Sequence, residues 1–327
     1  MSKKSITVLG GCGYVGTPLT ETLLAEGHQV RVFDIQWFGN HLPKHKNLEV
    51  HKTNILDLSA PDFADSDVVI HLANVANDPC SELNPKLSWE TNVLATMSLI
   101  EACIEAKVEH FIFASSGSVY GIKDEEKVTE HLSLNPISDY NKTKMVAERV
   151  LLSYKEKLPI SIIRPATVCG FSSRMRLDLT VNILTMQALT RKQITVFGGK
   201  QIRPHIHIAD LISVYQHFIA NGRTLSGVYN AGFENKTVLE VAQAIAQRID
   251  AQIIIKEDAV DPRSYRLCSD KLMGTGFRPR YGYQEAIADL HAAYQSGELV
   301  DSDLCYNIKT MLKTFTPSSN VKAPKAN

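Results

Sequence analysis

Short strand-like runs alternate with helix-like segments along the first half of the chain. The strand-like runs are rich in β-branched residues, and several are apolar throughout, as expected of strands covered on both faces. They lie at residues 6–9, 29–34, 48–51, 67–73, 110–116 and 160–165. Segments of helical composition separate them at 17–27, 89–106 and 140–154. This alternation predicts a doubly wound parallel sheet of the α/β class, the Rossmann architecture.

The pattern becomes less regular after Gly170. Helix-like segments occur at 180–190, 210–221 and 237–250, and strand-like runs at 194–199, 201–208, 227–230 and 252–255. The run at 227–230 is predicted to return to the main sheet. We therefore predict a Rossmann domain at 1–170 joined by 208–234, and a smaller mixed α/β substrate-binding lobe at 171–207 and 235–315. Residues 316–327 lack a core pattern and are predicted to form a flexible tail.

A glycine-rich turn joins the first strand to the first helix. Gly10, Gly13 and Gly16 keep a G-x-x-G-x-x-G spacing there, and Asp34 ends the second strand. Glycines let the backbone approach a pyrophosphate at the helix N-terminus, where free N–H groups favour anions. An acid about 20 residues later suits the ribose hydroxyls and repels a 2′-phosphate. The segment predicts a dinucleotide site that prefers NAD to NADP, and the turn at 54–57 suits the adenine edge.

Tyr140 and Lys144 lie four residues apart in a segment that continues to Leu151 without Gly or Pro. On a helix, positions i and i+4 share a face. A free tyrosine has a pKa of about 10 and is a weak base at neutral pH. An ammonium group one turn away favours the phenolate and brings proton transfer into working range. This spacing also arises by chance on surface helices, so its weight comes from the dinucleotide site that precedes it.

Composition narrows the class of partner. The 35 Lys and Arg residues balance 35 Asp and Glu residues, so a nucleic-acid-binding protein is not expected. No apolar run approaches the roughly 20 residues of a membrane span, and the basic start breaks into glycines too early for a signal peptide. The six cysteines are scattered without a C-x-x-C motif, which favours reduced thiols and no metal site. We expect a cytoplasmic protein without nucleic-acid or membrane partners.

Taken together, these features resemble the extended short-chain dehydrogenase/reductase family, which includes the NAD-dependent nucleotide-sugar epimerases and dehydratases. The resemblance covers about residues 6–277, and its motifs are specific in combination. They are Gly10-x-x-Gly13-x-x-Gly16, His71-Leu72-Ala73, Asn92-Val93, Ser115-Ser116-Gly117-Ser118-Val119-Tyr120-Gly121, Tyr140-x-x-x-Lys144 and Arg164-Pro165.

The resemblance implies roles for individual residues. Tyr140 would be the general base, Lys144 would hold the nicotinamide ribose and lower the pKa of the tyrosine, and Ser116 would hydrogen-bond the reacting sugar oxygen. Asn92 would support the active site. The implied cofactor-binding residues are Gly10, Gly13, Tyr14, Val15, Gly16, Asp34, Asn54, Ile55, Leu72, Ala73, Asn92, Tyr140, Lys144 and Pro165.

The resemblance also implies a set of substrate contacts. They are Ser118, Asn182, Arg203, Arg263, Arg174 and Arg176. The arginines suit a substrate diphosphate, because a guanidinium group binds phosphate in bidentate fashion. An ordinary surface arginine is the alternative at each of these positions.

Departures from the family's motifs reduce the number of reactions that this chain is expected to catalyse. Relatives that remove water across C4–C6 carry an Asp-Glu pair directly after the serine or threonine, where this chain has Gly117 and Ser118. Decarboxylating relatives place a glutamate there. Relatives that epimerise beside a ketone use a cysteine near Ser118, and serine is too weak an acid to replace it readily. Cys169 stands where the family often has tyrosine, and we interpret it as a packing residue rather than a catalytic thiol.

The chemistry that remains needs serine, tyrosine, lysine and NAD. We predict a nucleotide-sugar 4-epimerase of carbohydrate metabolism that forms a transient 4-keto intermediate and keeps its NAD bound. A 4-keto reductase or dehydrogenase, a dehydratase of the same family, and a non-catalytic NAD-binding regulator are the alternatives. The expected partners are a nucleotide-diphosphate sugar and a second copy of the chain, in a homodimer formed by the helices around 89–106 and 140–154.

Overall fold

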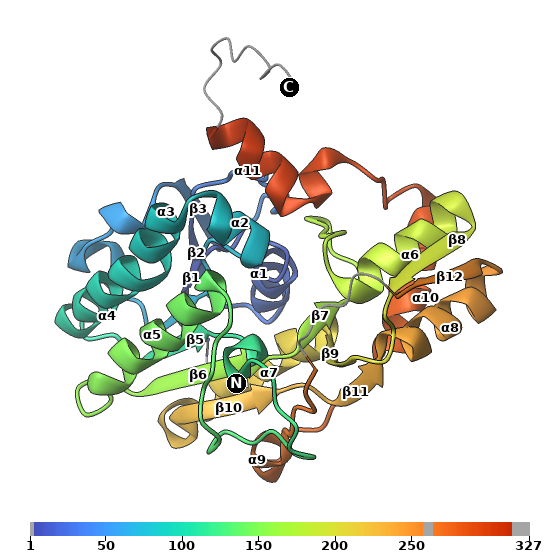
Figure 1. The fold of residues 1–327 in the computed structure, drawn as a ribbon. Coiled ribbons are helices and arrows are strands. Elements are labelled where there is room, and N and C mark those ends of the chain that lie inside the picture. The colour runs from blue at the N-terminus through green and yellow to red at the C-terminus, as the bar shows by residue number, and fades with distance from the viewer. Residues whose placement is uncertain (1–2, 258–263, 316–327) are drawn as a thin grey trace, which may run out of the picture.

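The computed structural model describes residues 3–257 and 264–315. At its centre lies a seven-stranded sheet in which every neighbouring pair of strands is parallel (Figure 1). The strand order is β10-β6-β5-β4-β1-β2-β3. The bounds are β1 Ser5–Leu9, β2 Gln29–Asp34, β3 Leu48–Lys52, β4 Val68–His71, β5 His110–Ala114, β6 Ile160–Pro165 and β10 Gly227–Ala231. The predicted doubly wound sheet is confirmed, and β10 joins it at the edge beside β6.

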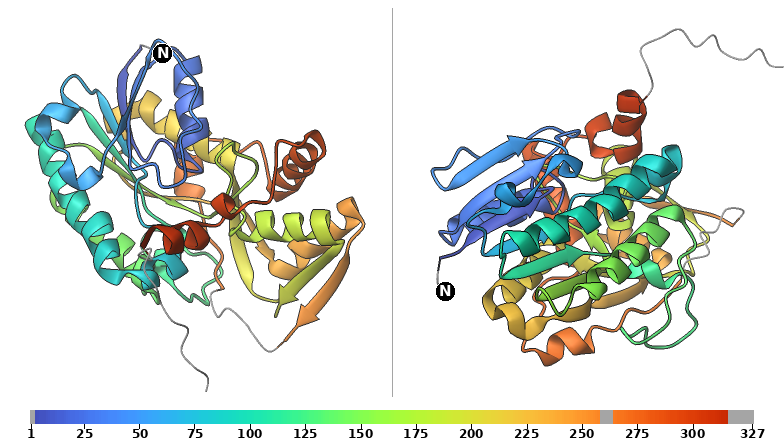
Figure 2. Two further views of the ribbon diagram at one scale, coloured as in Figure 1. Left: turned by 90° about the horizontal axis from the view of Figure 1, so that it is seen from above. Right: turned by 90° about the vertical axis from the view of Figure 1, so that its left-hand side faces the viewer.

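Each face of the sheet has its own core. Alternate side chains of the strands point to opposite faces, as the pleat requires. α1 (Gly16–Ala25) and α7 (Ile208–Asn221) cover one face, and α4 (Ala95–Glu105) and α5 (Asp139–Ser153) cover the other (Figure 2). Burial on both faces explains why the central strands β4, β5 and β6 are buried at successive positions rather than at every second one.

The helix predicted at 89–106 is composite. α3 (Pro85–Trp89), the π-helical turn η3 (Glu90–Leu94) and α4 follow one another without a break. Asn92 lies buried in the π-turn, where its side chain accepts from the backbone N–H of Val75 (2.8 Å) and donates to Oγ1 of Thr143 (3.0 Å). The turn therefore ties the loop after β4 to helix α5.

A smaller lobe lies beside the carboxyl ends of the main strands (Figure 1). It contains a three-stranded sheet in the order β11-β9-β7, with both parallel and antiparallel pairing, and a parallel pair β12-β8. Its elements are β7 Thr167–Cys169, α6 Thr180–Arg191, β8 Gln193–Phe197, β9 Ile202–His207, β11 Glu234–Thr237, α8 Val238–Ile249, β12 Gln252–Lys256 and α10 Tyr283–Ser296. The predicted mixed α/β lobe is confirmed, although β7, β11 and α10 were not predicted.

The last described helix returns to the Rossmann domain. α11 (Asn307–Phe315) lies against α2 (Asp78–Leu83), and its Met311 packs with Val75 and Cys80 (Figure 1). The last residues of the predicted lobe at 235–315 thus contact the Rossmann domain, and the division of the chain into these domains stays a prediction. Residues 316–327, predicted to form a flexible tail, lie outside the described residues.

Several short elements complete the described chain. They are η1 Ile55–Asp57, η2 Ala60–Phe63, η4 Gly117–Tyr120, η5 Gly222–Leu225, α9 Asp270–Gly274 and η6 Asp303–Cys305. Within the described ranges, no helix has the length and apolar content that crossing a membrane requires.

Candidate active site

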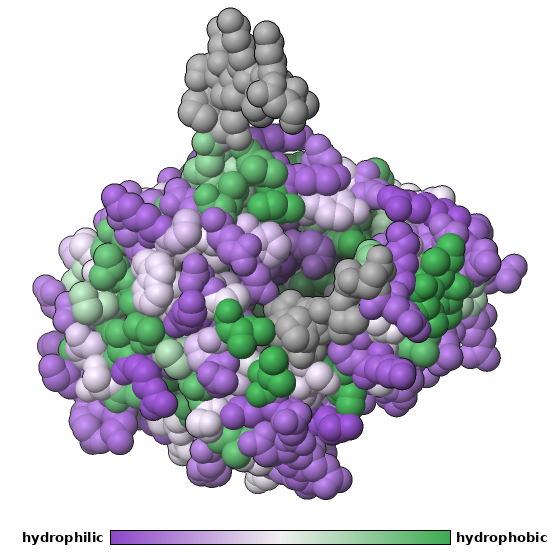
Figure 3. Space-filling model, in the orientation of Figure 1, coloured by the Kyte–Doolittle hydropathy of each residue, from purple (hydrophilic) through white to green (hydrophobic). Residues whose placement is uncertain are grey.

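A cavity of about 380 Å³ lies between the Rossmann domain and the smaller lobe. Gly10, Leu72, Ala114 and Pro165, at the carboxyl ends of β1, β4, β5 and β6, all line it. Figure 3, in the same orientation as Figure 1, shows a hollow near the centre of the surface, between the Rossmann domain and the smaller lobe. The strand order reverses between β1 and β4, and ligands of open parallel sheets bind at such a switch point.

The glycine-rich turn forms one wall of the cavity. Gly10 has a left-handed φ of +84°, and a Cβ atom there would lie 2.7 Å from the amide N of Ala73. A Cβ atom on Gly16 would lie 2.2 Å from the carbonyl O of Gly10. α1 begins at Gly16, and no side chain caps its N-terminus. Main chain and the positive end of a helix dipole thus meet at the cavity wall, an arrangement that binds phosphate.

The carboxylate of Asp34 lies at the same end of the cavity. Its two oxygens accept hydrogen bonds from the backbone N–H groups of Cys12 (3.0 Å) and Gln36 (2.6 Å). Burial raises the pKa of Asp34, while these two hydrogen bonds act in the opposite direction. The carboxylate is held against the cavity by its backbone partners, in a position suited to ribose hydroxyls.

Replacing Asp34 with asparagine is expected to lower the preference for NAD over NADP by about 10-fold or more. The amide keeps an acceptor oxygen but loses the negative charge that repels a 2′-phosphate. Ten-fold is about 1.4 kcal/mol, a modest part of the several kcal/mol that a like-charge contact costs. Calorimetric titration of both cofactors measures the ratio, with Asp303→Asn on the surface as the control. An unchanged ratio would place Asp34 away from the adenosine ribose.

Ser116, Tyr140 and Lys144 line the other end of the cavity. Oγ of Ser116 lies 2.6 Å from Oγ of Ser118. Ser118 in turn donates to Oδ1 of Asn141, the residue after Tyr140. These hydroxyls connect the end of β5 to the first turn of α5, so the predicted catalytic residues share one wall.

The pKa of the Tyr140 phenol is shifted by burial and by neighbouring groups. Burial raises this pKa to about 12, and the largest opposing effect comes from the guanidinium group of Arg176, followed by a hydrogen bond with Ser116. Lys144 instead donates from Nζ to the carbonyl O of Ala114 (2.7 Å). The cation with the largest lowering effect on the phenol is Arg176, and the role of Lys144 in lowering this pKa stays a prediction.

Lys144 lies one helical turn from the buried ion pair of Glu148 and Arg164. Burial lowers the pKa of Lys144 to about 7, and Glu148, one turn further along α5, opposes this shift. Glu148 accepts two hydrogen bonds from Arg164, Nε–Oε1 at 2.9 Å and Nη2–Oε2 at 2.6 Å, and a third from Ser115. Arg164 also donates to the hydroxyl of Tyr120 (2.7 Å). The network joins α5 to the ends of β5 and β6 directly behind the predicted catalytic residues.

Lys144 makes the stability of the fold depend on pH. Its pKa of about 7 in the fold lies below the ordinary value of about 10.4, so between these values the unfolded chain binds the extra proton. The free energy of unfolding therefore rises with pH across this window, by at most about 1.4 kcal/mol per unit from this group. Urea unfolding from pH 7 to 10 should show the wild type gaining stability relative to Lys144→Met. Parallel pH curves for the two proteins would contradict the shift.

The predicted substrate contacts do not all reach the cavity. Ser118, Arg174 and Arg176 line it. Asn182 lies behind the wall instead, where it accepts from the N–H of Gly170 (3.1 Å) and donates to the hydroxyl of Tyr14 (3.1 Å). Arg203 is buried in β9 and does not line the cavity. Arg263 lies outside the described residues.

Among the predicted cofactor-binding residues, Asn92 alone is away from the cavity, because the π-turn directs its side chain to Val75 and Thr143. Asn92 therefore supports the cavity wall from behind through these hydrogen bonds. The structure brings the others to one surface. They are Gly10, Gly13, Tyr14, Val15, Gly16, Asp34, Asn54, Ile55, Leu72, Ala73, Tyr140, Lys144 and Pro165.

Residues 6–232 match the model of the NAD dependent epimerase/dehydratase family. The chain belongs to this family. A relative from Bacillus subtilis (strain 168), named an uncharacterized UDP-glucose epimerase YtcB, is 33% identical over 258 residues, which cover 73% of this chain and 80% of the relative.

Two solved structures are similar over most of the chain. The UDP-glucose 4-epimerase of Thermus thermophilus in complex with NAD is 26% identical, with a TM-score of 0.78, and the match covers 89% of this chain and 99% of that one. TunA, a NAD-dependent NDP-hexosamine 5,6-dehydratase, is 27% identical, with a TM-score of 0.81, and the match covers 90% of this chain and 98% of that one.

NAD is the cofactor of this epimerase/dehydratase family, and the cavity wall fits it. The two glycines that cannot carry a Cβ atom and the uncapped start of α1 suit the pyrophosphate. Asp34 suits the adenosine ribose at one end, and Tyr140 and Lys144 lie at the other.

Cys169 is fully buried, and burial raises the pKa of its thiol. The thiol donates to the carbonyl O of Ile206 (3.5 Å). These contacts fit the interpretation of Cys169 as a packing residue.

Sequence reasoning missed several polar residues of the cavity wall, and Asp78 and Asn307 are two of them. Asp78 accepts from Oγ of Ser138 (2.5 Å) and lies close enough to raise the pKa of Tyr140. The Asn-Asp-Pro sequence at 77–79 could have indicated a helix start in the segment after β4. Asn307 reaches the wall from α11, and no local pattern marks it because its position depends on packing across the molecule.

Proposed function

We propose that the protein is a nucleotide-sugar 4-epimerase that uses NAD and acts through a transient 4-keto sugar. The observation that carries this proposal is the convergence of Ser116, Tyr140 and Lys144 on one end of the cavity, with Gly117 and Ser118 beside them. This set can move a hydroxyl proton, and the two positions after Ser116 carry no carboxylic acid to eliminate water.

The residues divide the work of the reaction. When bound, NAD supplies reversible acceptance of a hydride at its nicotinamide. Tyr140 removes the proton of the sugar 4-hydroxyl, and Ser116 hydrogen-bonds the same oxygen. The guanidinium group of Arg176 stabilises the phenolate, since it has the largest lowering effect on the pKa of Tyr140. After the 4-keto sugar presents its other face, the hydride is returned to C4 and the phenol returns the proton to the 4-oxygen, which gives the 4-epimer.

Arg176 has the charge environment expected beside a proton-transfer site. It pairs with Asp178 through Nε–Oδ1 (2.8 Å) and Nη2–Oδ2 (3.2 Å). The pair fixes the guanidinium plane, so its effect on Tyr140 does not require a substrate to organise it. We propose that Arg176 also contacts the substrate, since it lines the cavity beside Tyr140.

Purified protein should be incubated with UDP-, GDP-, CDP- and dTDP-hexoses, and the products separated by anion-exchange chromatography and identified by NMR. The expected result is a 4-epimer from at least one of them, without added cofactor and without net change in NAD. Stoichiometric consumption of added NADH with a 4-keto sugar would identify a reductase instead. Absence of any 4-epimer would contradict the proposal.

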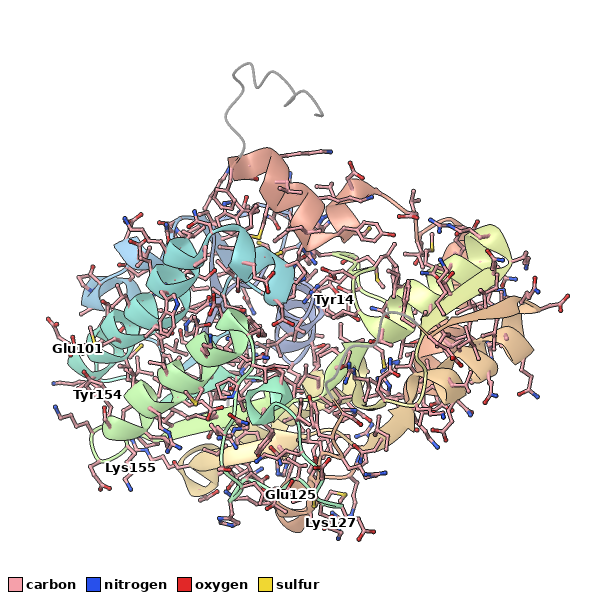
Figure 4. The ribbon with its side chains drawn as sticks, viewed as in Figure 1. Tyr14, Glu101, Glu125, Lys127, Tyr154 and Lys155 are labelled. Atoms are coloured by element: carbon pink, nitrogen blue, oxygen red, sulfur yellow. The ribbon has the colours of Figure 1, made fainter. Side chains whose placement is uncertain are left out.

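We also propose a homodimer formed through α4 and α5. These helices run side by side across one face of the molecule (Figure 2), and Tyr154 on the turn after α5 donates to Glu101 on α4 (2.6 Å; both are labelled in Figure 4). Leu94 and Met97 are 51% and 39% exposed on this surface. Light scattering after gel filtration should give twice the mass of the 36.3 kDa chain, and Leu94→Glu with Met97→Glu should give the single mass.

The cytoplasm is the proposed location. All six cysteines are free thiols, and free thiols are the rule in the reducing cytoplasm. A nucleotide-diphosphate sugar remains the proposed substrate class, with the base and the sugar to be identified by the incubation described above.

A further inference from the structure

Arg174 is a buried cation with no carboxylate partner. Only 3% of it is exposed, and no ion pair of the described residues includes it. Its Nη2 donates to Oδ1 of Asn307 (2.7 Å), and its Nη1 makes a long contact with the carbonyl O of Met175 (3.4 Å). Its Nε has no acceptor. A buried guanidinium group is unfavourable without an anion, so this site favours a negatively charged ligand.

The neighbouring Arg176 is different, although both arginines come from one short segment. Asp178 neutralises Arg176 through two hydrogen bonds, and Arg176 lies near Tyr140. Arg174 lies near Asp34, and it also lies close enough to Arg176 and Asp178 for both of them to act on its pKa. The two side chains are therefore neighbours in one cavity wall, but Arg174 acts on Asp34 whereas Arg176 acts on Tyr140.

Hydrogen bonds join the segment that carries Arg174 to the glycine-rich turn. Ser172 donates to the carbonyl O of Tyr14 (2.9 Å), and the hydroxyl of Tyr14 donates to the carbonyl O of Gly170 (2.7 Å). Tyr14 lies between the Rossmann domain and the smaller lobe (Figure 4). These bonds hold the backbone just before Arg174 against the turn where phosphate is expected.

Two further elements fix the guanidinium group. The ring of Phe38, in the loop after β2, lies 3.9 Å from the guanidinium carbon of Arg174. Asn307, which accepts from Arg174, begins α11, and the last residue of that helix, Phe315, meets Trp37 edge-on at 5.4 Å between ring centroids. The loop after β2 and the C-terminal helix thus hold Arg174 between them, which pre-organises its free N–H group.

We propose that Arg174 binds the pyrophosphate of the dinucleotide, and that Phe38 and Asn307 position it for this contact. The inference rests on the proposed NAD site but not on the sugar reaction. It also separates the two arginines: Arg174 serves the cofactor and Arg176 serves the reacting end. The segment 170–176 would then close the cofactor against the glycine turn, which is consistent with an enzyme that keeps its NAD through the cycle.

The test measures binding rather than turnover. Cofactor-free wild type, Arg174→Met and Arg174→Lys should be titrated with ADP-ribose and with adenosine, and the NAD-loaded proteins with UDP. Arg174→Met should weaken ADP-ribose about 10- to 100-fold, as expected for loss of a charged hydrogen bond, and leave adenosine and UDP binding unchanged. Arg174→Lys keeps the charge and should show a smaller loss. Arg191→Met, an exposed arginine at the end of α6, is the matched control.

Other outcomes would overturn the inference. Unchanged ADP-ribose affinity in folded Arg174→Met would show that the residue does not meet the pyrophosphate. If Arg174→Met loses only UDP binding, Arg174 contacts the substrate diphosphate instead. If it loses binding of NADP but keeps that of ADP-ribose, Arg174 contacts a 2′-phosphate. If Arg174→Met fails to fold, Asn307→Leu removes the positioning contact and should weaken ADP-ribose about 3- to 10-fold, and no change would overturn the inference. Wild type that binds ADP-ribose but epimerises no sugar would refute the proposed function alone.

Discussion

Replacing Tyr140 with phenylalanine is expected to lower kcat by about 10³-fold while the protein keeps its NAD. The change removes one hydroxyl, and general acid–base catalysis by a positioned group contributes about 10²- to 10⁴-fold. The effect should be large, because Ser116 can hydrogen-bond the sugar oxygen but has no base to accept its proton. The phenol is buried, so we do not expect a solvent molecule to take over its role as the base.

The measurement is the initial rate of 4-epimer formation per mole of bound NAD, with the NAD released by heat and quantified by chromatography. Tyr294→Phe on α10 makes the same chemical change at an exposed position and should keep the wild-type rate. A Tyr140→Phe protein that loses less than about five-fold in kcat would refute the role of this residue.

The second large effect concerns the ion pair behind the site. Replacing Glu148 with glutamine should lower the free energy of unfolding by about 3–5 kcal/mol, the range found when one partner of a buried pair is removed. Glu148 is 1% exposed and its carboxylate accepts from Arg164 and Ser115. The substitution leaves a buried guanidinium group without its counter-charge, while the side-chain shape stays nearly the same.

A double-mutant cycle makes this prediction specific. Arg164→Met alone should also be strongly destabilising, and Glu148→Gln with Arg164→Met together should cost less than the sum of the two, because no unpaired charge remains. Denaturant unfolding of the four proteins supplies the values. As a control for an exposed pair, Asp270→Asn, which breaks the contact with Lys127 (3.1 Å), should leave the free energy of unfolding almost unchanged. Additive, small effects at Glu148 and Arg164 would contradict the account.

Local sequence patterns predicted the parts of the molecule that local physics determines. β2 and β6 have the predicted bounds. β6 is buried at almost every position, whereas β2 alternates polar Gln29 and Arg31 with valines and ends at Asp34. The glycine turn was predictable since close approach at Gly10 and Gly16 excludes a Cβ atom. The shared wall of Ser116 and Tyr140 followed from the family resemblance, and the structure brings the two together.

Long-range packing determined what the sequence could not predict. Arg174 and Arg176 look equivalent in the chain, yet only Arg176 meets a carboxylate, because Asp178 folds back beside it. The helix that begins at Asn307 reaches the cavity from the end of the described chain. Asn92 was predicted at the cavity, but the π-turn directs it to buried partners. In each case the position depends on how separate elements pack, so spacing alone carries no information about it.

The central claim is that the hydrogen on the sugar C4 leaves and returns within one closed site beside Tyr140. The most direct measurement uses a nucleotide sugar carrying deuterium at C4, incubated in ordinary water until half is converted, with the 4-epimer analysed by NMR and mass spectrometry. The account predicts that the epimer keeps its deuterium at C4 and gains no hydrogen from solvent. Loss of the label to water, or conversion without any change at C4, would contradict it.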